Sequence, residues 1–241
     1  MSRPIPILMY HQIDASPPRG TPWRSLIVTP SAFARQMALL RFFGYRGVSM
    51  SDLESGLSGE RTEKLVGITF DDGFRNNFEF ALPVLRANGF TATCYAISNA
   101  LGGRNAWDED KGVEQKALMS AGELRQWAAA GMDVGAHTRH HVDLQTLSTE
   151  AARDEIAGAK RELEAALGSE VRHFCYPFGS FNAAHRAMAE EAGYHSATTV
   201  QRGRACAADD RFALPRIPIV HSTSLPVFFA KIATHYEDKH R

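Results

Sequence analysis

Residues 65–73 read Leu65-Val66-Gly67-Ile68-Thr69-Phe70-Asp71-Asp72-Gly73, and this stretch decides the fold. Its apolar first part is typical of a buried strand. Successive strand side chains point to opposite faces, so a regular strand cannot aim both Asp71 and Asp72 at one site. A turn at Gly73 can, because glycine accepts backbone angles that other residues avoid. Two close carboxylates repel each other unless a cation or a shared proton relieves them. We therefore expect a metal site here.

A second motif supplies further metal ligands. The stretch His137-Thr138-Arg139-His140-His141 places two histidines four residues apart, so a helical turn or a tight loop brings both rings to one face. One carboxylate with two histidines leaves open metal positions, which is typical of a catalytic site. We predict Asp72, His137 and His141 as ligands of a divalent metal, with zinc as first choice among several suitable ions. Asp71 then remains free as the general base.

The order of the segments predicts an α/β protein. Strand-like and helix-like segments alternate about seven times, which favours a parallel sheet. Candidate residues follow the ends of the apolar runs, as in a closed α/β barrel or an open doubly wound sheet. The pattern alone does not distinguish the closed barrel from the open sheet. We interpret residues 1–241 as one domain, in which 51–63 is a polar connection, 216–220 is the last strand, and 99–116 is a functional polar insertion.

Composition excludes several classes of function. Lys+Arg 27 and Asp+Glu 27 give zero net charge, which argues against nucleic acid as a partner. The 3 cysteines include no Cys-x-x-Cys pair, so neither a disulfide framework nor a thiolate zinc site is indicated. No apolar run approaches the roughly 20 residues of a membrane span, and the start lacks the apolar core of a signal peptide. We expect a protein of the cytoplasm, or one peripheral to the membrane. The oligomeric state stays open.

Three motifs in order resemble those of the polysaccharide deacetylase family. They are Thr69–Gly73, His137-Thr138-x-x-His141 and Phe174–Gly179, and the similarity extends from about Ile7 to about Val220. The resemblance implies an irregular (β/α)7 barrel and a metal-dependent hydrolase that removes N-acetyl groups from the amino sugars of a polysaccharide or oligosaccharide.

The beginning of the chain, Leu8-Met9-Tyr10-His11, is similar to the poly-N-acetylglucosamine deacetylase branch of the family. In that branch a histidine of the first strand replaces a C-terminal one, which implies His11 as the general acid, with His221 as its rival. Members with the commoner third motif have an arginine where this chain has Cys175. We propose Arg216 as the replacement that orients Asp71.

The resemblance also points to a substrate wall. The candidate substrate-binding residues are Tyr176, Phe178, Gly179 and Trp107, whose aromatic rings would hold an acetyl methyl or a sugar face.

Three alternatives remain beside this reading. A metal-independent amidohydrolase of the same fold would act on a small cyclic or linear amide. A non-catalytic glycan-binding module would keep the fold without the reaction. A non-haem iron oxygenase also uses two histidines and one carboxylate, but the alternation of strands and helices does not suit its usual β-sandwich.

Overall fold

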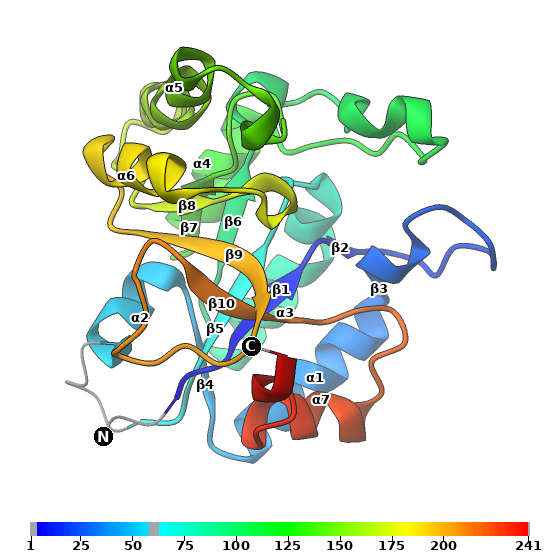
Figure 1. The fold of residues 1–241 in the computed structure, drawn as a ribbon. Coiled ribbons are helices and arrows are strands. Elements are labelled where there is room, and N and C mark those ends of the chain that lie inside the picture. The colour runs from blue at the N-terminus through cyan, green and yellow to red at the C-terminus, as the bar shows by residue number, and fades with distance from the viewer. Residues whose placement is uncertain (1–3, 58–62, 241) are drawn as a thin grey trace.

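A closed ring of parallel strands forms the centre of the computed structural model, which describes residues 4–57 and 63–240 (Figure 1). β1 pairs with both β10 and β5, and this double pairing closes the ring. The closed α/β barrel that the resemblance implied is therefore confirmed, and the open sheet is excluded. The strands of the ring are β1 (Ile7–Tyr10), β5 (Leu65–Phe70), β6 (Thr93–Ala96), β7 (Asp133–Ala136), β8 (His173–Cys175), β9 (Ser196–Arg202) and β10 (Leu214–Pro218).

The barrel is irregular at several places. β4 (Arg46–Val48) pairs with the first half of β5, whereas β6 pairs with the second half, so these two strands divide one edge of β5. The register between β9 and β10 shifts between Leu214 and Arg216. A separate two-stranded ladder joins β2 (Gln12–Ile13) to β3 (Ile27–Val28) beyond the end of β1.

Helices cover the outside of the ring (Figure 1). Several begin at a polar cap: the Thr29 side chain accepts the Ala32 N–H, and Ser120 with Glu123 forms a capping box. Among the described residues no helix has the length and apolar character to cross a membrane. The α-helices are α1 (Pro30–Phe42), α2 (Met50–Leu57), α3 (Leu82–Asn88), α4 (Ala121–Ala129), α5 (Thr149–Leu167), α6 (Ala183–Glu191) and α7 (Leu225–Ala233). Shorter helical turns are η1 (Arg24–Leu26), η2 (Asn77–Ala81), η3 (Ser98–Ala100), η4 (Ala106–Lys111), η5 (Leu144–Thr146), η6 (Pro177–Gly179) and η7 (Asp238–His240).

Two expected boundaries were wrong. The polar connection expected at 51–63 contains α2, whose residues Met50, Leu53 and Gly56 are buried at a helical spacing of three, and residues 58–62 lie outside the described part. The last strand runs over Leu214–Pro218 rather than 216–220. The shift places Arg216 in the middle of the strand, inside the barrel.

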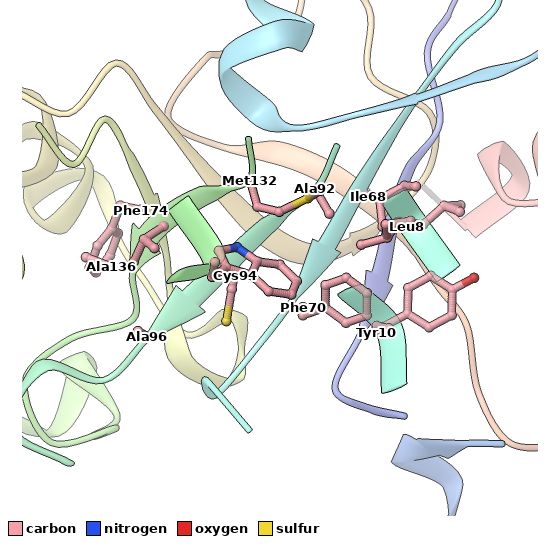
Figure 2. Packing of buried hydrophobic residues seen from close by; sticks show 14 of the residues in the cluster. Leu8, Tyr10, Ile68, Phe70, Ala92, Cys94, Ala96, Met132, Ala136 and Phe174 are labelled. Carbon is pink, nitrogen blue, oxygen red and sulfur yellow. The ribbon is translucent and has the colours of Figure 1, made fainter. Parts of the chain in front are cut away.

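The core fixes the strand ends that carry the site. All six residues of β5 are buried, as expected for a parallel strand covered on both faces. Figure 2 shows Tyr10, Phe70 and their apolar neighbours from adjacent strands. The rings of Tyr10 and Phe70 stack with centroids 5.6 Å apart, and Trp127 of α4 meets Phe70 edge-on at 6.0 Å. Close packing on both faces of β5 leaves Asp71 and Asp72 little freedom to move.

Candidate active site

A cavity of about 170 Å³ opens at the carboxyl ends of the strands, where an α/β barrel places its site. It brings together most of the residues predicted from the sequence. Four lining residues were not predicted: Trp23, Leu26, Asp108 and Val200. The cavity is lined by His11, Trp23, Leu26, Asp71, Asp72, Trp107, Asp108, His137, His141, Tyr176, Phe178 and Val200.

The predicted metal ligands converge on one point. The Nε2 atoms of His137 and His141 lie 3.5 and 3.2 Å from Oδ1 of Asp72, and all three side chains are buried. The His137 Nδ1–H donates to the Cys175 carbonyl oxygen at 2.7 Å, because a carbonyl can only accept. This bond fixes the ring so that Nε2 of His137 faces the Asp72 carboxylate, and metal-binding histidines commonly hold a backbone carbonyl in this way.

The charges of the ligand group also suit a cation. Burial opposes ionisation of Asp72, but hydrogen bonds from His137 and His141 hold the pKa of this carboxyl well below its usual value. Burial lowers the pKa of His141, so its ring is neutral near pH 7 and can offer a lone pair. Two ring nitrogens and a carboxylate oxygen within 4.8 Å of one another form a donor set that fits a divalent ion.

A second group, Asp71 with His137 and Cys175, also meets this distance criterion. It is a poorer metal site, because Arg216 donates to both oxygens of Asp71, at 2.6 and 2.7 Å. Those two bonds occupy the carboxylate from its buried side.

The backbone is strained around the ligands. In the described residues, the non-glycine residues with left-handed φ are Trp23, Asp72, Thr138, His141 and Phe178. Asp72 itself takes this conformation with φ 72°, beside Gly73 with φ 73°, so the turn between strand and site uses both residues. The sequence had indicated Gly73 alone. Thr138 fixes the second turn, because its hydroxyl donates to the His137 carbonyl and accepts the His141 N–H at 3.0 Å.

Glu155 of α5 secures the loop that carries the second histidine. Its carboxylate accepts the backbone N–H groups of Arg139 and His140, at 2.8 and 3.0 Å, and contacts the His140 ring at 2.6 Å. His140 therefore turns away from the ligands, toward Glu155 and Asn99.

Asp71 is held by Arg216 of β10, which is fully buried. Besides its two bonds to Asp71, the guanidinium donates to the Thr199 carbonyl at 2.8 Å and to the Thr69 hydroxyl at 3.0 Å. Its Nη2 also lies 3.2 Å from the sulfur of Cys175. Burial would raise the pKa of Asp71, but the charge and hydrogen bonds of Arg216 bring it below the usual value.

The two candidate acids occupy different places. His11 lines the cavity, with its Nε2 4.0 Å from Oδ2 of Asp71. His221 is not a lining residue. Its Nδ1–H donates to the Ile27 carbonyl at 3.0 Å, and its backbone N–H donates to Ser25 at 2.9 Å, so it supports the segment before α1.

The predicted substrate wall is present in part. The rings of Trp107 and Phe178 each lie 4.7 Å from the His141 ring, and Phe178 is 51% exposed. Tyr176 lines the cavity but is otherwise buried, with its hydroxyl donating to the Phe212 carbonyl. Gly179 does not line the cavity. A Cβ on Gly179 would lie 2.3 Å from the Val200 side chain, so glycine serves close packing behind Phe178.

Known proteins resemble this chain along most of its length. It is 28% identical to the putative polysaccharide deacetylase YxkH of Bacillus subtilis, over 95% of this chain and 76% of that protein. It is 25% identical to the poly-β-1,6-N-acetyl-D-glucosamine N-deacetylase of Escherichia coli, over 89% of this chain but only 37% of that longer protein. The structure of the Streptococcus pyogenes deacetylase PplD in complex with acetate matches with a TM-score of 0.84 and 27% identity, over 96% of this chain and 99% of that one.

The family model for polysaccharide deacetylase matches residues 58–197, which is more than half of the chain and includes Asp71, Asp72, His137 and His141. With the closed barrel and the site at its carboxyl end, this match shows that the chain belongs to the polysaccharide deacetylase family.

Proposed function

We propose that this protein is a metal-dependent hydrolase that removes N-acetyl groups from the amino sugars of a polysaccharide or oligosaccharide, with residues 1–241 as one domain of this kind. The observation that carries the proposal is the separation of the two adjacent carboxylates. Asp72 faces His137 and His141, whereas Asp71 faces Arg216. One carboxylate can thus bind a metal while the other takes part in proton transfer.

Asp72, His137 and His141 would hold the metal, for which zinc is our first choice because imidazole and carboxylate donors suit it. When bound, the ion supplies Lewis acidity toward water and the acetyl carbonyl. Metal dependence is general for the family.

Asp71 would accept a proton from the attacking water. Arg216 keeps this carboxylate ionised and fixes its orientation through two parallel hydrogen bonds. A carboxylate of low pKa is a weak base toward free water, but it would suffice beside a divalent ion held by Asp72, His137 and His141. Arg216 is thus a positioning residue, and Asp71 is the group that touches the reacting atoms.

His11 would protonate the departing amine, because the C–N bond breaks only when the nitrogen leaves as a neutral amine. Histidine is the usual donor near neutral pH. The backbone N–H of Phe178 is our candidate for stabilising the oxyanion, since the first N–H groups of a helical turn such as η6 lack an acceptor within the turn.

Acetate release from defined oligosaccharides tests the proposal. N-acetylglucosamine oligomers with β-1,4 and β-1,6 linkages are supplied to metal-free protein and to protein reloaded with zinc. We expect release only from the reloaded protein, and an Asp71→Asn variant that retains zinc but loses about 10²–10⁴-fold in turnover. Equal activity without metal would favour the metal-independent amidohydrolase, and oligomer binding without acetate release would favour the glycan-binding module.

A further inference from the structure

We infer that Trp23 is a stacking platform for the sugar ring whose acetyl group is removed. This inference rests on the proposed function and adds a residue to its site. Trp23 lies in the segment between β2 and β3, where the sequence analysis predicted no site residue.

Trp23 is presented to the cavity and is not used by the fold. It lines the cavity and is 47% exposed. Within residues 4–57 and 63–240 its indole makes no hydrogen bond and no ring contact. Trp127 is the contrast: it is fully buried, and its Nε1–H donates to the Asp133 carbonyl. A half-exposed tryptophan that lines a cavity and whose N–H has no partner among the described residues is suited to an amphipathic ligand such as a pyranose.

The segment around Trp23 is ordered by specific contacts. The Trp23 carbonyl accepts the Leu26 N–H at 2.9 Å, and the Arg24 guanidinium donates to the Pro17 carbonyl at 3.0 Å. His221 holds the same segment from the C-terminal side through Ser25 and Ile27, as described above. These contacts keep Trp23 at φ 54°, a left-handed conformation that costs free energy in a bulky residue.

The reaction itself determines which side of the cavity must hold the sugar. The departing nitrogen belongs to the sugar, so the sugar must lie beside the acid, His11. Trp23 and Leu26 follow His11 in the chain, just beyond the two-residue strand β2, and line the cavity together with it. Trp107 and Phe178 instead pack on the metal ligand His141, beside the place where the acetyl carbonyl must lie.

In Figure 1 the segment between β2 and β3 and the insertion between β6 and α4 are separate projections of the backbone. Trp23 belongs to the first and Trp107 to the second, whereas Phe178 comes from η6. We therefore assign the sugar ring to Trp23 and the acetyl group to the wall of Trp107 and Phe178.

A comparison of two substrates tests this division. An N-acetylglucosamine oligomer carries both the sugar and the acetyl group, whereas 4-nitrophenyl acetate carries the acetyl group without a sugar. For Trp23→Ala we expect kcat/KM to fall about tenfold or more on the oligomer, mainly through KM, and much less on the aryl ester. Trp23→Phe should restore most of the oligomer activity, because it keeps a stacking ring. Trp107→Ala should lower activity on both substrates.

Phe42→Ala is the matched control. Phe42 is another exposed aromatic residue, 82% exposed at the end of α1 and outside the cavity. Its replacement should leave kcat/KM unchanged on both substrates. Trp23→Gly checks folding. Because glycine relieves the left-handed strain, this variant should melt above Trp23→Ala while binding the oligomer equally poorly.

Binding is measured separately from turnover. Calorimetry with the oligomer compares Asp71→Asn with the Asp71→Asn, Trp23→Ala double variant, and we expect a Kd about tenfold or more higher in the double variant. Equal Kd values, or equal losses on the two substrates, would overturn the role of Trp23. If the unaltered protein releases no acetate from any oligomer, the proposed function itself fails, and this outcome is distinguishable from the other two.

Discussion

Replacing Arg216 by methionine should destabilise the protein strongly at neutral pH. The side chain is fully buried and donates to both oxygens of Asp71, whose own side chain is only 4% exposed. Methionine fills much of the same volume, so the variant removes the cation without leaving a large cavity. A buried ion pair that loses one partner typically costs about 3–5 kcal/mol, because the remaining charge stays buried and uncompensated. Total stabilities are only about 5–15 kcal/mol.

The pH dependence of this loss has a definite sign. In the unaltered protein burial opposes ionisation of Asp71, but Arg216 brings its folded pKa below the usual value. The stability from this pair is therefore present above the unfolded pKa of about 3.9, and it is lost as pH falls through the folded pKa. In Arg216→Met burial is opposed only by the charges of His11 and His137, which lower the pKa of Asp71 less than Arg216 does, so we expect the folded pKa to rise above the unfolded one. The stability gap between the two proteins should then shrink as the pH falls and Asp71 of the variant takes up a proton.

Urea unfolding of metal-free protein at pH 7 and at lower pH measures both effects. The Asp71→Asn background supplies the control, because no unpaired charge remains there, and Arg216→Met should cost much less in it. Arg216→Lys keeps the charge but not the two parallel hydrogen bonds, so its free energy of unfolding should lie between those of the unaltered protein and Arg216→Met. Two results would refute this reasoning: a loss below about 1 kcal/mol in the native background, or the same loss in both backgrounds.

Three further predictions follow from the site and from the opposite end of the barrel. Asp72→Ala should lower bound zinc per chain in metal analysis far more than Asp71→Asn, because only Asp72 faces both ligand histidines; the reverse order would exchange their roles. His11→Ala should retain zinc but lose about 10²–10⁴-fold in kcat on an acetylated oligosaccharide, and less on an aryl acetate, whose leaving group needs little protonation; a selective loss in His221→Ala instead would move the acid to the C-terminal end. His173 is buried between Ser51 and Ser196, and burial lowers its pKa to about 3. As the pH falls, His173 is therefore protonated in the unfolded chain before it is protonated in the folded protein. The free energy of unfolding should then fall by about 1.4 kcal/mol per pH unit below pH 6.5, and unfolding titrations of His173→Gln should show a smaller slope.

The sequence predicted those parts of the site that depend on local pattern. A fully apolar run before two carboxylates predicted a buried strand that ends at the site, and Leu65–Phe70 is such a strand. The spacing of His137 and His141 predicted rings on one face, and both lie against Asp72. In each case the sequence pattern and the structural feature that it predicts lie within the same few consecutive residues.

The contact between Arg216 and Asp71 could not be read from local pattern, because the two residues lie 145 positions apart. Only the resemblance to a family suggested it, and the closed ring explains it, since β10 and β5 flank β1 on either side. Trp23 was missed for another reason. Its segment has loop composition, and composition shows neither that other loops hold it in place nor that one indole points into the cavity.

The distribution of backbone strain connects fold and site. Every non-glycine residue with left-handed φ in the described ranges either lines the cavity or, as Thr138 does, bonds the ligand histidines. Each such residue costs of order 1–3 kcal/mol, so it persists only where its surroundings fix it. Buried strands provide that support for Asp72, and Glu155 and Thr138 provide it for the loop of His141. Trp23 and Phe178 carry the same cost yet remain about half exposed. Both line the cavity, so their strain is found where the proposed function places the substrate.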